Sequence, residues 1–498
     1  MVLQRLLRAP TVPPLVESDD IYPVHMLDGT KTLQNIIVAW TLRFNDVLDA
    51  DKLHLSLSRL LEIGDWRKLG GRLRLKANGR GELEIHVPQP FTAERPAVSY
   101  THQTLAVDIE DHPLANTLPK ASEGPSIQPG PLDFQAFAAR QGPPATLEDF
   151  IYHDTPQLSL HITSFNDATL VALSWPHTLM DVMGQQALLR GWSLVLAGRE
   201  SEVPPMLGAR EDAICAAADA SVEKGEEEEF RLGQQQLKGW AMLKFGLRFA
   251  WDLLWNRVVE TRTIFLPKSV VAELRRQAQA DLAQGVGGEQ QPFLSDGDVL
   301  TAWAVRAVAS SLPQPRPVTV LHALNARFRL SSLVQASGVY VQNMAVAAFT
   351  FLSSEVATGP LGSIAMENRR HLMEQSTEAQ VLAFLRELRR ESMSGSDPAS
   401  LVCGQPDALL MPFTNWTRAD FFKTADFSPV LVRAGDRGPS RSNPPGTMVF
   451  HHAQSMRQNT AARNVIVVLG KDHGDNYWLT GALLPAAWAK IEEDMNRM

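Results

Sequence analysis

Two kinds of hydrophobic pattern alternate along this chain. Short runs with apolar residues at every second position, or in an unbroken stretch, predict strands, and apolar residues three or four positions apart predict helices. The strand patterns cover residues 32–44, 158–165, 170–175, 261–266, 318–324, 465–469 and 477–483. The helix patterns cover residues 51–63, 185–196, 269–280, 299–310 and 363–390. The pattern therefore predicts an α/β (α+β) fold.

Turn-forming residues add detail to this prediction. An Asn-Gly-Arg-Gly turn divides residues 69–87 into a hairpin, and Asn166-Asp167 does the same for residues 158–175. Residues 112–144 are rich in Pro, Gly and Ser and are expected to form a loop. Ser295 and Asp298 have the spacing of a capping box, which predicts the start of a helix.

The length of 498 residues is too great for one ordinary hydrophobic core. The polar, Pro-containing stretch 199–205 marks a boundary, so we expect a domain over 1–205, a helical crossover over 206–260 and a domain over 261–498. Within the crossover, residues 239–255 are largely apolar but carry a polar stripe. That stripe and the short length argue against a transmembrane span. We expect this helix to dock on its own protein, with a membrane-surface contact as the alternative.

Composition excludes several classes of protein. The formal net charge is −8 and the chain has no cluster of basic residues, which disfavours a nucleic-acid partner. Two cysteines provide neither a disulfide framework nor a thiolate metal site. The N-terminal segment is interrupted by prolines and lacks the continuous apolar core of a signal peptide. We therefore expect a cytoplasmic protein, acting as a monomer.

The strongest candidate for chemistry is the segment 169–184, TLVALSWPHTLMDVMG. An apolar strand ends at Pro176, and His177, Asp181 and Gly184 follow it. A histidine just past a strand end can face a cleft and act as a general base, oriented by a nearby acid. Spacing alone leaves a second interpretation open, in which Asp181 caps the next helix and His177 only packs beneath it.

Four further motifs accompany this one, in a fixed order along the chain. They are LGGRLR at 69–74, LSDGDVLTAW at 294–303, NARFRL at 325–330 followed by Gly338 and Asn343, and TNW at 414–416 followed by Asp426-Phe427. Together with the HxxxDxxG pattern of His177, Asp181 and Gly184, they resemble the BAHD acyltransferases, especially the fungal members of secondary metabolism. One departure is that the family's DFGWG segment is replaced here by DFSPV at 426–430.

The resemblance implies two chloramphenicol acetyltransferase-like domains, each a mixed sheet flanked by helices, with an active-site channel at their interface. It implies that His177 is the general base for an acceptor that attacks acyl-CoA in a ternary complex. Asp181 would pair with Arg327, and Thr414 and Trp416 would donate hydrogen bonds to the oxyanion. Gly184 and Asp426 would support the site. Acyl-CoA would be a co-substrate, and no cofactor or metal is expected.

Two other functions stay open at this point. The altered DFSPV segment is compatible with a condensation-like enzyme that uses a carrier-protein thioester or catalyses a cyclisation. A degenerate, non-enzymatic homologue is the third possibility, although the presence of His177, Asp181, Arg327 and Trp416 argues against it. The adjacent His451 and His452 are not expected to bind metal, because neighbouring residues on a strand point to opposite faces.

Overall fold

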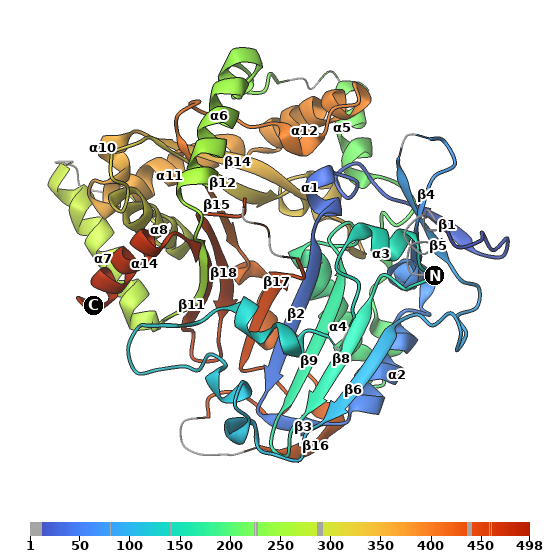
Figure 1. The fold of residues 1–498 in the computed structure, drawn as a ribbon. Coiled ribbons are helices and arrows are strands. Elements are labelled where there is room, and N and C mark those ends of the chain that lie inside the picture. Colours follow the sequence, from blue (N-terminus) through green and yellow to red (C-terminus); the bar gives the residue numbers. More distant parts are fainter. Residues whose placement is uncertain are drawn as a thin grey trace, which may run out of the picture.

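Two β-sheets lie next to each other at the centre of the protein (Figure 1). The structure is a computed structural model that describes residues 12–498 except 80, 140–141, 224, 226–227, 286–291, 436–440, 458 and 460. The first part of the N-terminal segment interpreted above as lacking a signal peptide therefore lies outside the described residues. No helix among the described residues has the length and apolar character needed to cross a bilayer.

The smaller central sheet has five strands. In spatial order they are β17 (Phe450–Ser455), β2 (Ile37–Phe44), β9 (Thr169–Pro176), β8 (Ser159–Ser164) and β6 (Ser99–Thr104). The larger sheet has seven strands. In spatial order they are β14 (Ala345–Leu352), β12 (Val318–Asn325), β15 (Leu409–Asn415), β18 (Val465–Lys471), β19 (Tyr477–Leu483), β11 (Glu260–Leu266) and β7 (Ser126–Pro129). Both sheets mix parallel and antiparallel pairs.

Small sheets and helices complete the architecture. The small sheets are β1 (Asp20–Pro23) with β5 (Leu83–Val87) and β4 (Arg72–Leu75), β10 (Met206–Leu207) with β13 (Val339–Tyr340), and β16 (Leu431–Ala434) with β3 (Asp46–Leu48). The helices are α1 (Lys31–Gln34), α2 (Ala50–Leu60), α3 (Leu147–Ile151), α4 (Val182–Leu196), α5 (Ala213–Glu223), α6 (Gly239–Trp255), α7 (Lys268–Gly285), α8 (Asp296–Ser310), α9 (Ser331–Val334), α10 (Ser354–Ala357), α11 (Leu361–Gln375), α12 (Glu378–Met393), α13 (Phe421–Thr424) and α14 (Pro485–Met495).

The two sheets share a hydrophobic core where they meet. Helices α7, α8, α11 and α14 bury their apolar sides against one face of the seven-stranded sheet. The opposite face contributes Phe265, Leu469 and Trp478 to a cluster that also holds Trp40 and Trp175 of the five-stranded sheet. Helices α2 and α4 belong to this shared cluster. The expected α/β class, with mixed sheets flanked by helices, is therefore confirmed.

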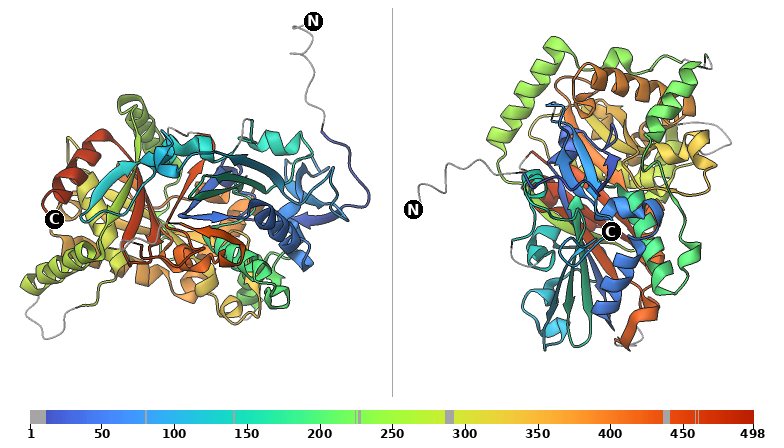
Figure 2. Two further views of the ribbon diagram at one scale, coloured as in Figure 1. Left: turned by 90° about the horizontal axis from the view of Figure 1, so that it is seen from below. Right: turned by 90° about the vertical axis from the view of Figure 1, so that its right-hand side faces the viewer.

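Each sheet takes one strand from the other half of the chain. Strand β7, from the first half, pairs with β11, and β17, from near the C-terminus, pairs with β2. The spatial division therefore differs from a simple cut near residue 205, and the boundaries 1–205, 206–260 and 261–498 stay a prediction. Figure 2 shows the same exchange from two further directions, because strands of different colour lie together within each sheet.

Most predicted elements are present, with some corrections. Both hairpins form, and the expected capping box closes with Ser295 accepting from the Asp298 backbone. The segment expected as one helix over 363–390 is two helices, α11 and α12, separated where Thr377 caps the second. The loop expected over 112–144 contains strand β7, which was not predicted. Residues at the start of the strand predicted over 32–44 form part of α1 instead.

Candidate active site

His177 lies at the point where the chain leaves the five-stranded sheet. Strand β9 ends at Pro176, and the His177 backbone N–H donates to the Ile36 carbonyl at 2.8 Å, which continues the pairing with the neighbouring chain segment. The residue is half-buried, and its Nδ1 is enclosed without a hydrogen-bond partner among the described residues. The backbone of His177 is thus fixed by the strand pairing.

Burial lowers the pKa of the His177 imidazole below its ordinary value. Three smaller effects oppose this: a contact with its own carbonyl, the charge of Asp181, and the Asn343 side chain. Desolvation is the largest effect because it penalises the charged imidazolium. The ring is therefore mainly neutral near pH 7 and can accept a proton.

Asp181 connects the helix after His177 to the larger sheet. One carboxylate oxygen accepts from the backbone N–H groups of Met183 and Gly184, each at 3.1 Å, and so caps α4. The other oxygen accepts from Arg327 Nη1 at 2.7 Å and from the Met344 N–H at 3.0 Å. The helix cap by Asp181, expected in the second interpretation, is present. The ion pair with Arg327, expected from the resemblance, is present too.

Arg327 is almost fully buried and uses its whole guanidinium group. Besides Asp181, it donates from Nε to the Tyr340 carbonyl at 3.1 Å and from Nη2 to the Gln342 carbonyl. It sits in a turn after β12 that the Asn325 side chain caps. Arg327 therefore ties the segment between β13 and β14 to the loop that carries His177.

Gly184 is required by the close approach of these segments. A Cβ atom at this position would lie 2.3 Å from the Val341 carbonyl oxygen and 2.7 Å from Met180 Cβ. Any larger residue would push α4 away from the β13–β14 segment. The expected supporting role of Gly184 thus has a steric basis.

Two residues that the sequence analysis did not assign to the site also hold this loop. The Asn343 side-chain amide donates to the His177 carbonyl and to Asp28, both at 2.8 Å. Asp28 also accepts from the Asn343 backbone, and burial raises the pKa of its carboxyl group to about 6, opposed by nearby Lys68. Asn343 could have been found through the Gly338–Asn343 motif, whereas Asp28 has no local signal.

Thr414 and Trp416 lie on the side of the larger sheet that faces the shared core. Thr414 pairs in register with Val467, which packs against that core, while the preceding Phe413 points into the helix-covered face. Trp416 is half-buried against the same core. Its ring meets the Phe421 ring edge-on, with the two ring centroids 6.3 Å apart. Both residues therefore lie on the face of the larger sheet that packs against the five-stranded sheet. Strand β9 of that five-stranded sheet ends just before His177.

Asp426 is exposed and makes a local turn. Its carboxylate accepts from the Ser428 N–H at 3.0 Å, and its own N–H donates to Ser193 Oγ on α4 at 3.1 Å. The next residue, Phe427, is buried and stacks on Phe44 at 5.1 Å. Ser428 begins a 3₁₀ turn, Ser428–Val430, with proline near its start. The DFSPV segment therefore turns through a 3₁₀ helix instead of through glycines.

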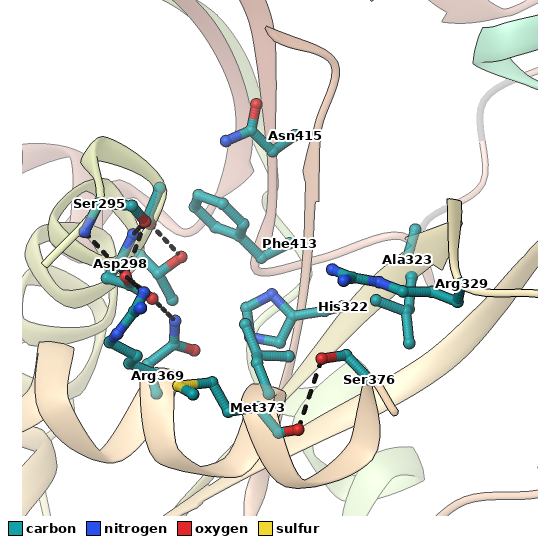
Figure 3. A pocket seen from close by; sticks show the side chains of 15 residues that line it. Ser295, Asp298, His322, Ala323, Arg329, Arg369, Met373, Ser376, Phe413 and Asn415 are labelled. Atoms are coloured by element: carbon teal, nitrogen blue, oxygen red, sulfur yellow. Dashed lines mark hydrogen bonds and ion pairs between the residues drawn. The ribbon is translucent and has the colours of Figure 1, made fainter. Parts of the chain in front are cut away.

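A cavity of about 280 Å³ lies on the helix-covered face of the larger sheet. It lies between β12, β15, the start of α8 and α11, and Figure 3 shows the Arg329 side chain reaching into it toward the His322 ring. Arg369 is a second cation on its wall. This cavity does not include His177, so the expected channel at the domain interface stays a prediction.

Two arginines near this cavity, Arg329 and Arg418, are candidates to bind an anion, whereas Arg369 already pairs with Asp298 at 3.4 Å. Arg418, two residues after Trp416, stacks its guanidinium on Phe328, 3.4 Å from the ring centroid. Burial, and then repulsion by Arg329, lowers the pKa of Arg418. The region is suited to bind an anionic group such as a phosphate.

The remaining candidate groups have structural surroundings. Trp40 Nε1 donates to His451 Nδ1 at 3.1 Å, and burial lowers the pKa of His451 and of His452 to about 3. Burial also raises the pKa of the Cys215 and Cys403 thiols to about 12, so neither is a thiolate near pH 7. Among the described residues, no group of three or more His, Cys, Asp or Glu side chains is placed to hold a metal ion.

Known proteins are similar to this chain over nearly its whole length. The O-acetyltransferase PaAT-2 of Phomopsis amygdali is 39% identical, covering 97% of this chain and 99% of its own. The acetyltransferase pyiB of Pyricularia grisea is 35% identical, covering 98% of this chain and 95% of its own. A relative of 35% identity and 98% coverage of this chain, calD of Penicillium decumbens, is named a transcriptional regulator.

The fold is also that of a solved structure. TRI101 of F. graminearum, crystallised with coenzyme A and T-2 mycotoxin, superposes with a TM-score of 0.66 at 13% identity. The match covers 96% of this chain and 98% of that one. No family profile in a scan of known families matches the chain.

Proposed function

The chain belongs to the BAHD acyltransferase family, and we propose that it moves an acyl group from acyl-CoA to a hydroxyl or amine of a small, largely apolar natural product. The observation that carries this proposal is the imidazole of His177 directly after strand β9, which burial keeps mainly neutral near pH 7. Its loop is held by Asp181, Arg327 and Asn343. An imidazole kept neutral and rigid suits a general base.

His177 would remove the acceptor's proton as the acceptor oxygen or nitrogen attacks the thioester carbonyl. The tetrahedral intermediate then collapses, the C–S bond breaks, and the imidazolium returns the proton to the departing CoA thiolate. Thr414 and the Trp416 indole N–H would stabilise the oxyanion, and such donors can each contribute about 3 kcal/mol. Asp181 would act by position, since its oxygens are occupied by Arg327 and three backbone N–H groups.

The cationic region around Arg329 and Arg418 supports an anionic donor. Coenzyme A carries several phosphate charges, and arginine recognises phosphate well. We propose that the phosphates bind near these two residues. The 3₁₀ turn of DFSPV keeps Phe427 anchored against Phe44, and the carrier-protein donor stays the alternative proposal.

We further propose direct transfer in a ternary complex, with no acyl-enzyme. Both cysteines have raised pKa values, which makes them poor nucleophiles at neutral pH. Incubation with radiolabelled acetyl-CoA and no acceptor should leave the protein unlabelled. A stable label on Cys215 or Cys403 would contradict this step. We also keep the proposals that the protein works as a monomer and in the cytoplasm.

The central experiment combines donor and acceptor panels. The purified chain is incubated with a set of acyl-CoAs and a host metabolite extract, and new esters or amides are identified by mass spectrometry. The proposal expects new acylated products with the wild type and none with His177→Ala, whose thermal unfolding and CoA binding should be preserved. His-dependent products without CoA binding in calorimetry would support a carrier-protein donor instead. No product with any donor would favour a non-enzymatic role.

A further inference from the structure

Helix α6 exposes an apolar stripe along its outer side. The stripe consists of Trp240, Leu243, Leu247, Trp251, Leu254 and Trp255. Its three tryptophans are 83%, 53% and 74% exposed, respectively. At helical spacing these six residues fall within a sector of about 120°. Figures 1 and 2 show α6 at the periphery of the protein, and the exposed fractions show that the stripe is on its uncovered side.

The opposite side of α6 attaches the helix to the part of the protein that contains the larger sheet. Asp252 accepts from Arg316 at 2.8 Å, and its backbone carbonyl accepts from Arg463 at 2.7 Å. Phe245 and Phe249 are half-buried and face a small cavity beside strand β15. The expected docking of this helix on its own protein is therefore present, but on the side of Phe245 and Asp252. The docking leaves the tryptophan stripe uncovered by the described residues.

Cations accompany the stripe although the protein as a whole is acidic. Residues 238–258 carry Lys238, Lys244, Arg248 and Arg257 against the single carboxylate of Asp252. The local charge is thus +3, whereas the whole chain has a formal net charge of −8. All four cationic residues are exposed, but Arg248 pairs with Asp252 at 3.7 Å, and Arg316 holds Asp252 from the inner side. Tryptophans flanked by lysine and arginine are typical of helices that lie in a membrane interface.

We propose that the α6 stripe docks on the surface of an anionic lipid bilayer, with the helix lying in the plane of the interface. The tryptophan and leucine side chains would enter the boundary between headgroups and acyl chains, and Lys238, Lys244 and Arg257 would contact anionic headgroups. A second copy of this chain is a poorer occupant. A twofold-symmetric contact would bring the same cations of both copies together. This inference does not depend on the proposed acyl transfer.

The test is flotation of the full chain with lipid vesicles. One set contains phosphatidylcholine alone, and the other contains phosphatidylcholine mixed with phosphatidylserine. We expect binding to the mixed vesicles that weakens with added salt. The Leu247→Ser/Trp251→Ser variant should lose at least about tenfold in partitioning, because it removes two exposed apolar anchors. Lys238→Gln and Lys244→Gln should each cost about fivefold on anionic vesicles only.

A matched control separates the stripe from general surface hydrophobicity. Leu55 on α2 and Val432 on β16 are 64% and 65% exposed, at the opposite end of the protein in Figure 1. The Leu55→Ser/Val432→Ser variant should bind vesicles like the wild type. All variants should keep the wild-type melting temperature, since the changed side chains are exposed.

Three results would overturn the proposal. The first is wild-type protein that floats with neither vesicle, and the second is a Leu247→Ser/Trp251→Ser variant that binds as well as the control. The third is a wild-type dimer in sedimentation velocity that this variant converts to a monomer, which would identify the stripe as a self-association surface.

Discussion

Replacing Arg327 by methionine should destabilise the protein strongly and slow its reaction. The Arg327 and Asp181 side chains are only 8% and 9% exposed, so the change leaves a buried carboxylate without its cation. Breaking such a buried pair typically costs about 3–5 kcal/mol. Three backbone N–H groups still donate to Asp181, so the loss from the broken pair itself should lie near the lower end of this range. Urea unfolding followed by tryptophan fluorescence measures it.

The same change releases the segment behind the His177 loop. The Tyr340 and Gln342 carbonyls lose their donor, and each buried unsatisfied group costs about 1–3 kcal/mol. Because this segment also carries Asn343, which holds the His177 carbonyl, kcat should fall together with stability. A double-mutant cycle with Asp181→Ala should give a coupling energy of at least about 2 kcal/mol.

The pair between Arg441 and Asp46 provides the control. It is also buried, with a 2.7 Å contact, and its carboxylate also accepts from two backbone N–H groups, those of Gly435 and Gly446. Asp46 follows the C-terminal end of β2. Ile36, whose carbonyl accepts from the His177 backbone, precedes the N-terminal end of the same strand. Arg441→Met should cost similar stability but leave kcat unchanged. An Arg327→Met variant with normal stability, or with kcat equal to that of Arg441→Met, would refute this reasoning.

Three further changes test other parts of the account. Gly184→Ala should lower the free energy of unfolding in urea by about 1–3 kcal/mol and reduce activity, because the new methyl would lie 2.3 Å from the Val341 carbonyl oxygen. The control is Gly246→Ala on α6, where the methyl enters open space and should be neutral or stabilising. A destabilising Gly246→Ala would contradict the steric argument. Asn343→Ala removes the hydrogen bond to the His177 carbonyl but no side chain proposed to touch acyl-CoA or the acceptor, so it should lower kcat more than it raises KM. A change in KM alone would contradict a positioning role. His322 and His452 have pKa values lowered by burial to about 4 and about 3. The unfolded state therefore binds more protons below pH 6.5, and each histidine should reduce the free energy of unfolding by up to about 1.4 kcal/mol per pH unit from 6.5 toward 4. Urea titrations at pH 7 and pH 5.5 measure this loss, and equal stability at both pH values would contradict it.

Local patterns in the sequence predicted the structure around His177 well. The strand before His177, the cap at Asp181 and the glycine at 184 are all encoded within 16 residues, where periodicity and capping rules apply directly. The Asp181–Arg327 pair was expected only from the resemblance to the BAHD family, because no rule of spacing connects residues 146 positions apart. Its geometry matches that expectation.

Non-local contacts explain what the sequence did not predict. Strand β7 lies in a Pro- and Gly-rich stretch, and it is a strand because its backbone pairs with β11 at the edge of the larger sheet. Asp28 reaches the His177 loop only through Asn343, 315 residues away. The uncovered stripe of α6 was also not predictable, since the pattern of an amphipathic helix does not say which side the rest of the protein covers.

The central claim is that the neutral imidazole of His177 takes a proton from the acceptor. The most direct measurement is the pH dependence of kcat/KM, for the wild type and for His177→Ala, with the first acceptor that the product screen identifies. Because burial lowers the pKa of His177, the wild-type profile should rise with pH and reach its plateau with a midpoint below 6.5. His177→Ala should lose about a hundredfold to ten-thousandfold and lack this rise. An unchanged rate and profile in His177→Ala would contradict the account.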